Sequence, residues 1–249
     1  MPRIRVMDRS PHFLEFLFSA FPQSDAITVI MQDSENDNFP RNNILGMFSP
    51  AMMITLVTVQ VEGGLAVLAI VIAWFADISL REMFVVNPLH FLLAVVAIVP
   101  VLALCRLVYM MPFKTVEFTR RFMRSVYNDF IRHCSVTQLL LVAVMSGIGE
   151  ELLFRGILQT FVTNACGDGT WGLAIGVILT SVLFGIVHPI NKLYVFLCIV
   201  IGIYLGLFFA WSGNNLIVPI IIHAFYNFIV FLAMPRLIGF KTDVHMSDT

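Results

Sequence analysis

Charged side chains are scarce in this sequence. They make up 12% of its 249 residues, whereas hydrophobic residues make up 59% and the mean hydropathy is +0.89. Soluble domains carry about 25% charged residues, so this composition excludes an ordinary soluble globule, and it equally excludes a disordered chain. The formal net charge is -1 and no basic run is present, so we expect no nucleic-acid partner.

Other signals of common protein classes are missing as well. The cysteines form no Cys-x-x-Cys pair, which argues against a zinc ribbon or a thioredoxin-like site, and no internal repeat is visible. The apolar run at residues 13–21 is short, contains Glu15 and has no cleavage site, so it does not resemble a signal peptide. We interpret it as a short helix that lies in the membrane interface.

Long apolar segments dominate what is present. Each approaches the ~20 residues that are needed to cross ~30 Å of hydrocarbon. The sequence therefore predicts an all-α, polytopic membrane protein with about six transmembrane helices. The predicted spans are residues 54–76, 88–111, 136–161, 171–190, 193–211 and 214–234.

The basic residues predict an orientation for these spans. If residues 112–135 are cytoplasmic, twelve of the 15 Lys and Arg residues lie on that side of the membrane, as the positive-inside rule requires, and both termini are cytoplasmic. The predicted organisation is a cytoplasmic N-terminal segment, two accessory helices, a basic connector, a catalytic core of four helices and a cytoplasmic tail. Their ranges are 1–53, 54–111, 112–135, 136–234 and 235–249.

Ionisable groups inside spans are expensive, so their positions carry information. The first cluster contains the adjacent carboxylates Glu150 and Glu151, followed by Arg155. Glu151 and Arg155 are separated by one helical turn and share a face, so Arg155 can neutralise Glu151. Glu150 then faces another direction in an apolar environment, which suits a carboxylate for general-base catalysis.

Two further clusters follow on later spans. His188 ends an otherwise apolar span, four residues after Phe184 and directly before Pro189. His223 and Asn227 are again one turn apart, so one helical face presents an imidazole and a carboxamide that can donate to an oxyanion. Together the clusters contain the parts needed to activate water against a carbonyl group, with or without a metal.

The ordered motifs Glu-Glu-x-x-x-Arg, Phe-x-x-x-His and His-x-x-x-Asn resemble those of the CPBP family of intramembrane proteases. This family is also called the CAAX-protease and bacteriocin-processing, or ABI, family, and it includes the Ras-converting CAAX endopeptidase. The resemblance covers about residues 136–230. It implies that Glu150 activates water, with His188 as its partner or as a metal ligand, and that Glu151 is the second motif glutamate. It further implies an oxyanion role for His223 and Asn227, a structural role for Arg155 and a packing role for Phe184.

Several alternatives stay open at this point. Glu150 and His188 activate water without a metal, or Glu150, His188 and His223 hold a divalent ion such as zinc. Glu62 either contacts the active-site cavity, or lies near the interface because its span begins later. One difficulty is geometric: Glu150 lies about 21 Å along its helix from the cytoplasmic end, whereas His188 lies close to that end. The two meet if the third span begins near residue 142 or the fourth continues past Pro189.

The sequence thus predicts an intramembrane endopeptidase that hydrolyses a peptide bond of a membrane-associated, prenylated or peptide substrate. Its lipid environment is the cell inner membrane if the protein is bacterial. The first alternative is a non-catalytic membrane scaffold or bacteriocin-immunity protein of the same fold. The second is a proton-coupled transporter, which the missing repeats disfavour.

Overall fold

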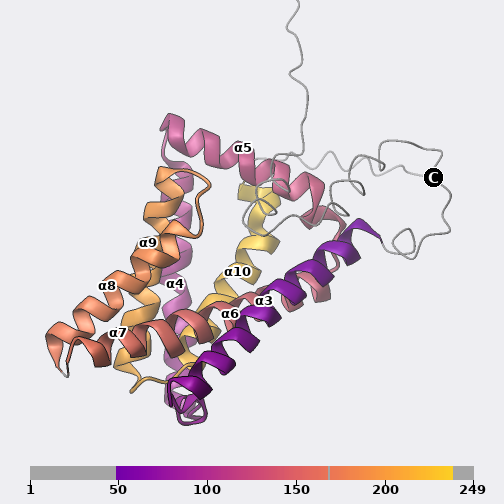
Figure 1. Cartoon of the computed structure of the whole chain (residues 1–249). Coiled ribbons are helices and arrows are strands. Elements are labelled where there is room, and N and C mark those ends of the chain that lie inside the picture. The colour runs from indigo at the N-terminus through magenta and orange to yellow at the C-terminus, as the bar shows by residue number, and fades with distance from the viewer. Residues whose placement is uncertain (1–48, 168, 238–249) are drawn as a thin grey trace, which may run out of the picture. The chain divides into compact units, whose positions relative to one another are not determined.

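The described part of the chain, in a computed structural model, comprises residues 49–167 and 169–237 (Figure 1). These residues form helices joined by short loops, and no strand occurs among them. The interfacial helix predicted at residues 13–21, and the tail beyond residue 237, lie outside the described residues. The prediction of an all-α polytopic membrane protein is confirmed.

The helices follow the predicted spans closely. Five are long and apolar enough to cross a membrane, and the helix Thr170–Ile186 is apolar but shorter, at 17 residues. In chain order the elements are α3 (Pro50–Phe75), η2 (Leu80–Met83), α4 (Pro88–Met110), α5 (Lys114–Asp129), η3 (Ile131–His133), α6 (Val136–Glu151), η4 (Leu152–Gln159), α7 (Thr160–Ala165), α8 (Thr170–Ile186), α9 (Lys192–Trp211) and α10 (Ile217–Leu237).

Local sequence explains where these helices begin. Ser49 and Asn87 cap the amino ends of α3 and α4, and in each case a proline occupies the next position, where its missing N–H would be unpaired in any case. Ser135 and Gln138 form a reciprocal capping box at the start of α6. The side chain of Asn191 caps α9.

The segment α6–η4–α7 forms the longest continuous helix and the centre of the packing. It runs from Val136 to Ala165, and its middle part, η4, is a π-helix. Helices α3 and α10 pack along α6, α4 packs on α10, and α8 packs on α9 and η4. Figure 1 shows that α6 slants steeply relative to α4 and α10.

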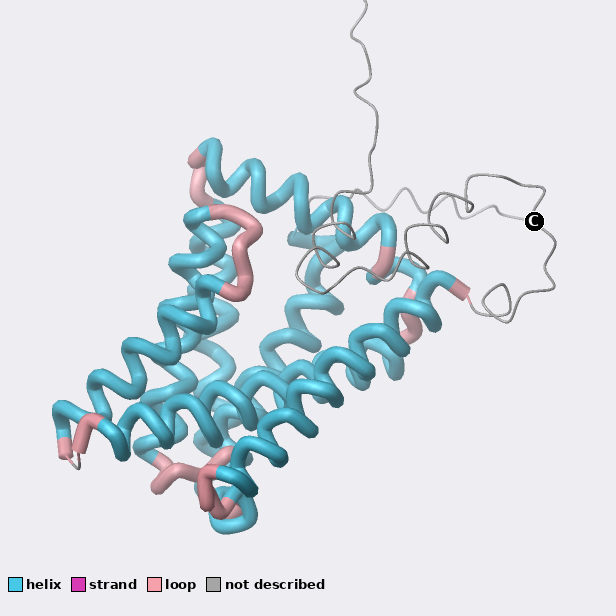
Figure 2. Tube along the Cα trace, viewed as in Figure 1, coloured by secondary structure: helices cyan, strands magenta, loops and turns pink. Residues whose placement is uncertain are grey.

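The loops gather at the two ends of this helix bundle (Figure 2). At one end, the side chain of Asn215 bonds to both backbone polar groups of Val85, which joins the α9–α10 loop to the α3–α4 loop. At the other end, Asn191 donates to Thr119 on α5, at 2.8 Å. Because α5 lies across this end, it contacts the loop that carries His188 and Pro189.

Candidate active site

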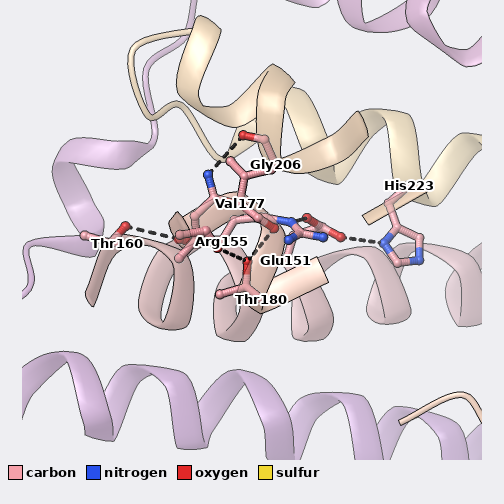
Figure 3. A network of polar contacts seen from close by, with 9 residues as sticks. Glu151, Arg155, Thr160, Val177, Thr180, Gly206 and His223 are labelled. Carbon is pink, nitrogen blue, oxygen red and sulfur yellow. Dashed lines mark hydrogen bonds and ion pairs between the residues drawn. The ribbon is translucent and has the colours of Figure 1, made fainter. Parts of the chain in front are cut away.

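A fully buried ion chain connects α6, η4 and α10. Arg155 Nε donates to Glu151 Oε2 at 3.0 Å, and His223 Nδ1 lies 2.8 Å from Glu151 Oε1 (Figure 3). A carboxylate only accepts, so Nδ1 carries the proton that His223 donates. The side chains of Glu151 and Arg155 are completely inaccessible to solvent, and that of His223 is nearly so. The predicted pairing of Glu151 with Arg155 is present, and His223 joins it.

Glu150 faces a different set of residues. Ser146 Oγ donates to Glu150 Oε1 at 3.2 Å, and Glu150 Oε2 lies 3.8 Å from His188 Nε2. The other ring nitrogen of His188 is 2.7 Å from the carbonyl oxygen of Phe184. Because a carbonyl only accepts, Nδ1 carries the proton, and Nε2 of the neutral ring presents a lone pair towards Glu150.

The meeting of Glu150 and His188 corrects one expectation from the sequence. Helix α6 begins at Val136 and α8 ends at Ile186, so neither proposed shift of the boundaries, to residue 142 or past Pro189, is right. The physical reason is tilt. Helix α6 runs obliquely through the bundle (Figure 1). Glu150 therefore lies less deep in the bundle than its distance along the axis of α6 suggests, and it reaches the level of His188.

Phe184 is the apolar centre of the site. Its ring centroid lies 4.8 Å from that of His188 and 6.1 Å from that of His223, and the Arg155 guanidinium sits 5.5 Å away over the ring face. Phe154 packs edge-on against the same ring at 5.0 Å. The arrangement provides close aromatic packing and a cation–π contact. The geometry therefore suits the packing role expected for Phe184.

The two third-motif residues have different surroundings. His223 stacks on Tyr226 with an interplanar angle of 10° and a centroid distance of 5.1 Å. Asn227 is half-buried, and no hydrogen bond joins its carboxamide to the residues that the structure describes. That carboxamide therefore keeps both its donor and its acceptor groups available.

Three residues near the site were not assigned from the sequence. No role was predicted for Ser146, although its position one helical turn before Glu150 is a usable signal. Tyr226 was not singled out, and it lies three residues after His223. The sequence allows two interpretations of Glu62. Helix α3 begins at Pro50, and within it Glu62 lies against Gly149 of α6.

The expected zinc ligands are not gathered into one set. In the described part of the chain, no three His, Cys, Asp or Glu side chains are arranged to hold one ion. Glu150 and His188 converge, whereas His223 lies with Glu151 and Arg155 in the buried ion chain. The residues present therefore do not fit a Glu150–His188–His223 metal site.

Comparison with known proteins finds a family match for the segment that carries these residues. Residues 132–229 match the family described as Rce1-like, Type II CAAX prenyl endopeptidase. The chain is also 30% identical over 114 residues to the uncharacterized protein YpbD of Bacillus subtilis (strain 168). That match covers 45% of this chain and 52% of YpbD, so the chain spans about half the length of this curated relative. No solved structure matches the chain significantly.

The family match confirms the resemblance that the three ordered motifs predicted. It extends from η3 into α10 and includes every motif residue. Helices α3, α4 and α5 lie outside the matched segment. The match supports the fold of a CAAX-type intramembrane protease for the segment, within an integral membrane protein.

Proposed function

We propose that this protein is an intramembrane endopeptidase of the CAAX type, in which Glu150 and His188 activate a water molecule. The observation that carries the proposal is the gap between the two side chains. Glu150 Oε2 and His188 Nε2 lie 3.8 Å apart, which is too long for a direct hydrogen bond. Both atoms are acceptors, and a water molecule that lies beside the pair can donate one hydrogen to each of them.

A water molecule that bridges Glu150 and His188 donates one hydrogen to each residue and is thereby oriented and made more nucleophilic. Its oxygen attacks the carbonyl carbon of the scissile peptide bond while Glu150 accepts the proton. The C–O bond forms, and the carbonyl oxygen becomes an oxyanion. Collapse of this intermediate breaks the C–N bond, and the proton held by Glu150 passes to the leaving amine. Atoms and charges balance, with water as the only co-reactant.

The remaining motif residues have supporting roles in the proposal. The carboxamide of Asn227 is available to donate to the oxyanion, since no described residue occupies it. His223 is held by Glu151, which Arg155 neutralises, so the imidazole has a fixed orientation. Phe184 packs against both imidazoles and supplies an apolar wall to the site.

The family description supports a substrate class. We propose a peptide that ends in a prenylated Cys-aliphatic-aliphatic-X sequence, or a similar membrane-associated peptide, presented at the cytoplasmic face. The positive-inside distribution of Lys and Arg supports that orientation, with both termini in the cytoplasm.

The test is cleavage by the purified full-length protein in detergent. The probes are a farnesylated Cys-aliphatic-aliphatic-X peptide with a fluorophore and quencher, and a pool of membrane-proteome peptides. We expect Glu150→Gln and His188→Ala to lower kcat by roughly 10²–10⁴-fold, the usual contribution of general-base catalysis. The control is Glu82→Gln, which changes an exposed glutamate in η2 in the same way.

Equal cleavage by wild type and both folded variants would refute the proposed chemistry. Absence of cleavage by the folded wild type with both probes would favour a non-catalytic scaffold instead. Addition of a chelator to each reaction separates metal-dependent from metal-independent cleavage.

A further inference from the structure

Helix α3 comes very close to the catalytic segment at one glycine, Gly149. A Cβ atom on Gly149 would collide with the backbone carbonyl oxygen of Glu62, and it would lie only 2.9 Å from Glu62 Oε2. The absence of a side chain at residue 149 therefore lets α3 and α6 come together here. Gly149 directly precedes Glu150, so the contact places Glu62 next to the proposed general base.

The carboxyl groups of Glu62 and Glu150 share an unusual property. Oε2 of each is buried and accepts no hydrogen bond within the described part of the chain. The two side chains are also close enough to interact electrostatically. Buried polar atoms in proteins are almost always hydrogen-bonded to protein or to ordered water. A water molecule that donates one hydrogen to each carboxyl group satisfies both atoms at once.

Such a water would supply the hydrogen bond that Glu150 Oε2 lacks. Ser146 already holds Oε1, whereas no described side chain donates to Oε2, the oxygen that faces His188. A general base acts efficiently only when its reacting oxygen is held in a narrow range of positions. Glu62 is on α3 and Ser146 is on α6, so the carboxyl group of Glu150 would be held from two helices.

We propose that Glu62 is a positioning residue for peptide-bond hydrolysis: through a bridging water it holds Glu150 Oε2 in place opposite His188. The inference rests on the proposed function and extends it to an accessory helix. Residues 132–229 do not include Glu62, so the catalytic segment requires α3 for full activity.

The experiment compares three α3 variants of the full-length protein with wild type and with Glu150→Gln, using the farnesylated peptide and the membrane-peptide pool described above. Glu62→Leu keeps the approximate volume but removes the polar atoms. Glu62→Gln keeps an oxygen and adds a donor, so it can still bind a bridging water. Gln60→Leu is the matched control, because Gln60 is exposed on the same helix. Thermal unfolding of each purified variant checks that it is folded.

We expect Glu62→Leu to lower kcat at least tenfold while KM changes less than threefold, because positioning acts on the chemical step and not on substrate binding. Glu62→Gln should remain within threefold of wild type, and Gln60→Leu should equal wild type. A kcat for Glu62→Leu equal to that of wild type would overturn the inference. A Glu62→Gln variant as slow as Glu62→Leu would also overturn it, since the side chain would then act through its charge.

The Glu150→Gln arm separates this failure from that of the proposed function. If Glu150→Gln abolishes cleavage and Glu62→Leu does not alter it, only the role of Glu62 is wrong. If Glu150→Gln cleaves as well as wild type, or if wild type cleaves neither probe, the proposed function is wrong, and the positioning role of Glu62 is then wrong as well.

Discussion

Replacement of Arg155 by Met tests whether the buried ion chain holds the helices together. Arg155 and Glu151 are both inaccessible to solvent, and their contact is a single charge-assisted hydrogen bond of 3.0 Å. Methionine fills a similar volume without a charge. The substitution would leave Glu151 with only His223 as a partner, and it would leave Oε2 of that carboxylate buried without a donor.

The structure sets the expected magnitude. Loss of one partner from a buried ion pair destabilises a protein by about 3–5 kcal/mol. Within the described part of the chain, the Nη1 and Nη2 atoms of Arg155 have no hydrogen-bond partner, and an unpaired buried donor is itself unfavourable by about 1–3 kcal/mol. Removal of Arg155 relieves part of that strain. We therefore expect Arg155→Met to lower the free energy of unfolding by about 3 kcal/mol, at the lower end of the range.

The assay is reversible unfolding in mixed detergent and dodecyl sulfate micelles, followed by circular dichroism. The double variant Glu151→Gln with Arg155→Met removes both charges, so it should be more stable than either single variant. Arg106→Met, an exposed arginine in the span α4, is the control. A loss below about 1 kcal/mol for Arg155→Met, or strict additivity in the double variant, would show that the pair is not energetically coupled.

Three further perturbations test other parts of the structure. Ser146→Ala removes the hydrogen bond to Glu150 Oε1 and should lower kcat about 2–10-fold in the peptide assay, since one such bond contributes about 0.5–1.5 kcal/mol. Asn215→Ala breaks hydrogen bonds to Val85 and to the amino end of α10, and it should lower the free energy of unfolding by about 2–3 kcal/mol in mixed micelles. Burial raises the pKa of Cys134 above its ordinary value of 9.0, so at pH 8 its thiolate fraction is small, and maleimide should label exposed Cys166 faster.

Each of these has a control or a contrary outcome. Ser146→Thr keeps the hydroxyl group and should retain most activity, whereas an unchanged kcat for Ser146→Ala would show that its hydrogen bond is dispensable. Asn214→Gly alters the exposed neighbour of Asn215 and suits the positive φ of 60° at residue 214. Equal stability of the two variants would contradict the bridging role of Asn215. For the cysteines, labelling of Cys134 as fast as Cys166 at pH 8, with both rising equally towards pH 10, would contradict the effect of burial.

The spans were predictable because hydrophobicity and caps are local properties. The predicted span 88–111 differs from α4 by a single residue, and the capping box at Ser135 fixes the start of α6 close to the predicted residue 136. The predicted span 171–190 was too long, because α8 ends at Ile186 and the residues after it form the loop that carries His188. The first span begins at Pro50 instead of residue 54.

The candidate site was only partly predictable. Helical spacing identified Glu151 with Arg155, since both residues lie on one helix. The contact of Glu151 with His223 joins residues 72 positions apart, and the approach of Glu62 to Gly149 joins two spans. Such contacts depend on how strongly each helix tilts, which a pattern along one helix does not encode. For the same reason, the meeting of Glu150 and His188 had seemed to require shifted boundaries.

The π-helical segment η4 has a consequence for how the sequence can vary. A π-turn holds one residue more than an α-turn. Deletion of one residue between Leu152 and Leu158 would therefore convert the π-turns into α-turns and leave the residues after it in register. Gln159, which donates to the Gly206 carbonyl of α9, would still face α9, and α7 would keep its position against α8. The chain can therefore lose one residue in this segment without disturbing the helices that follow it.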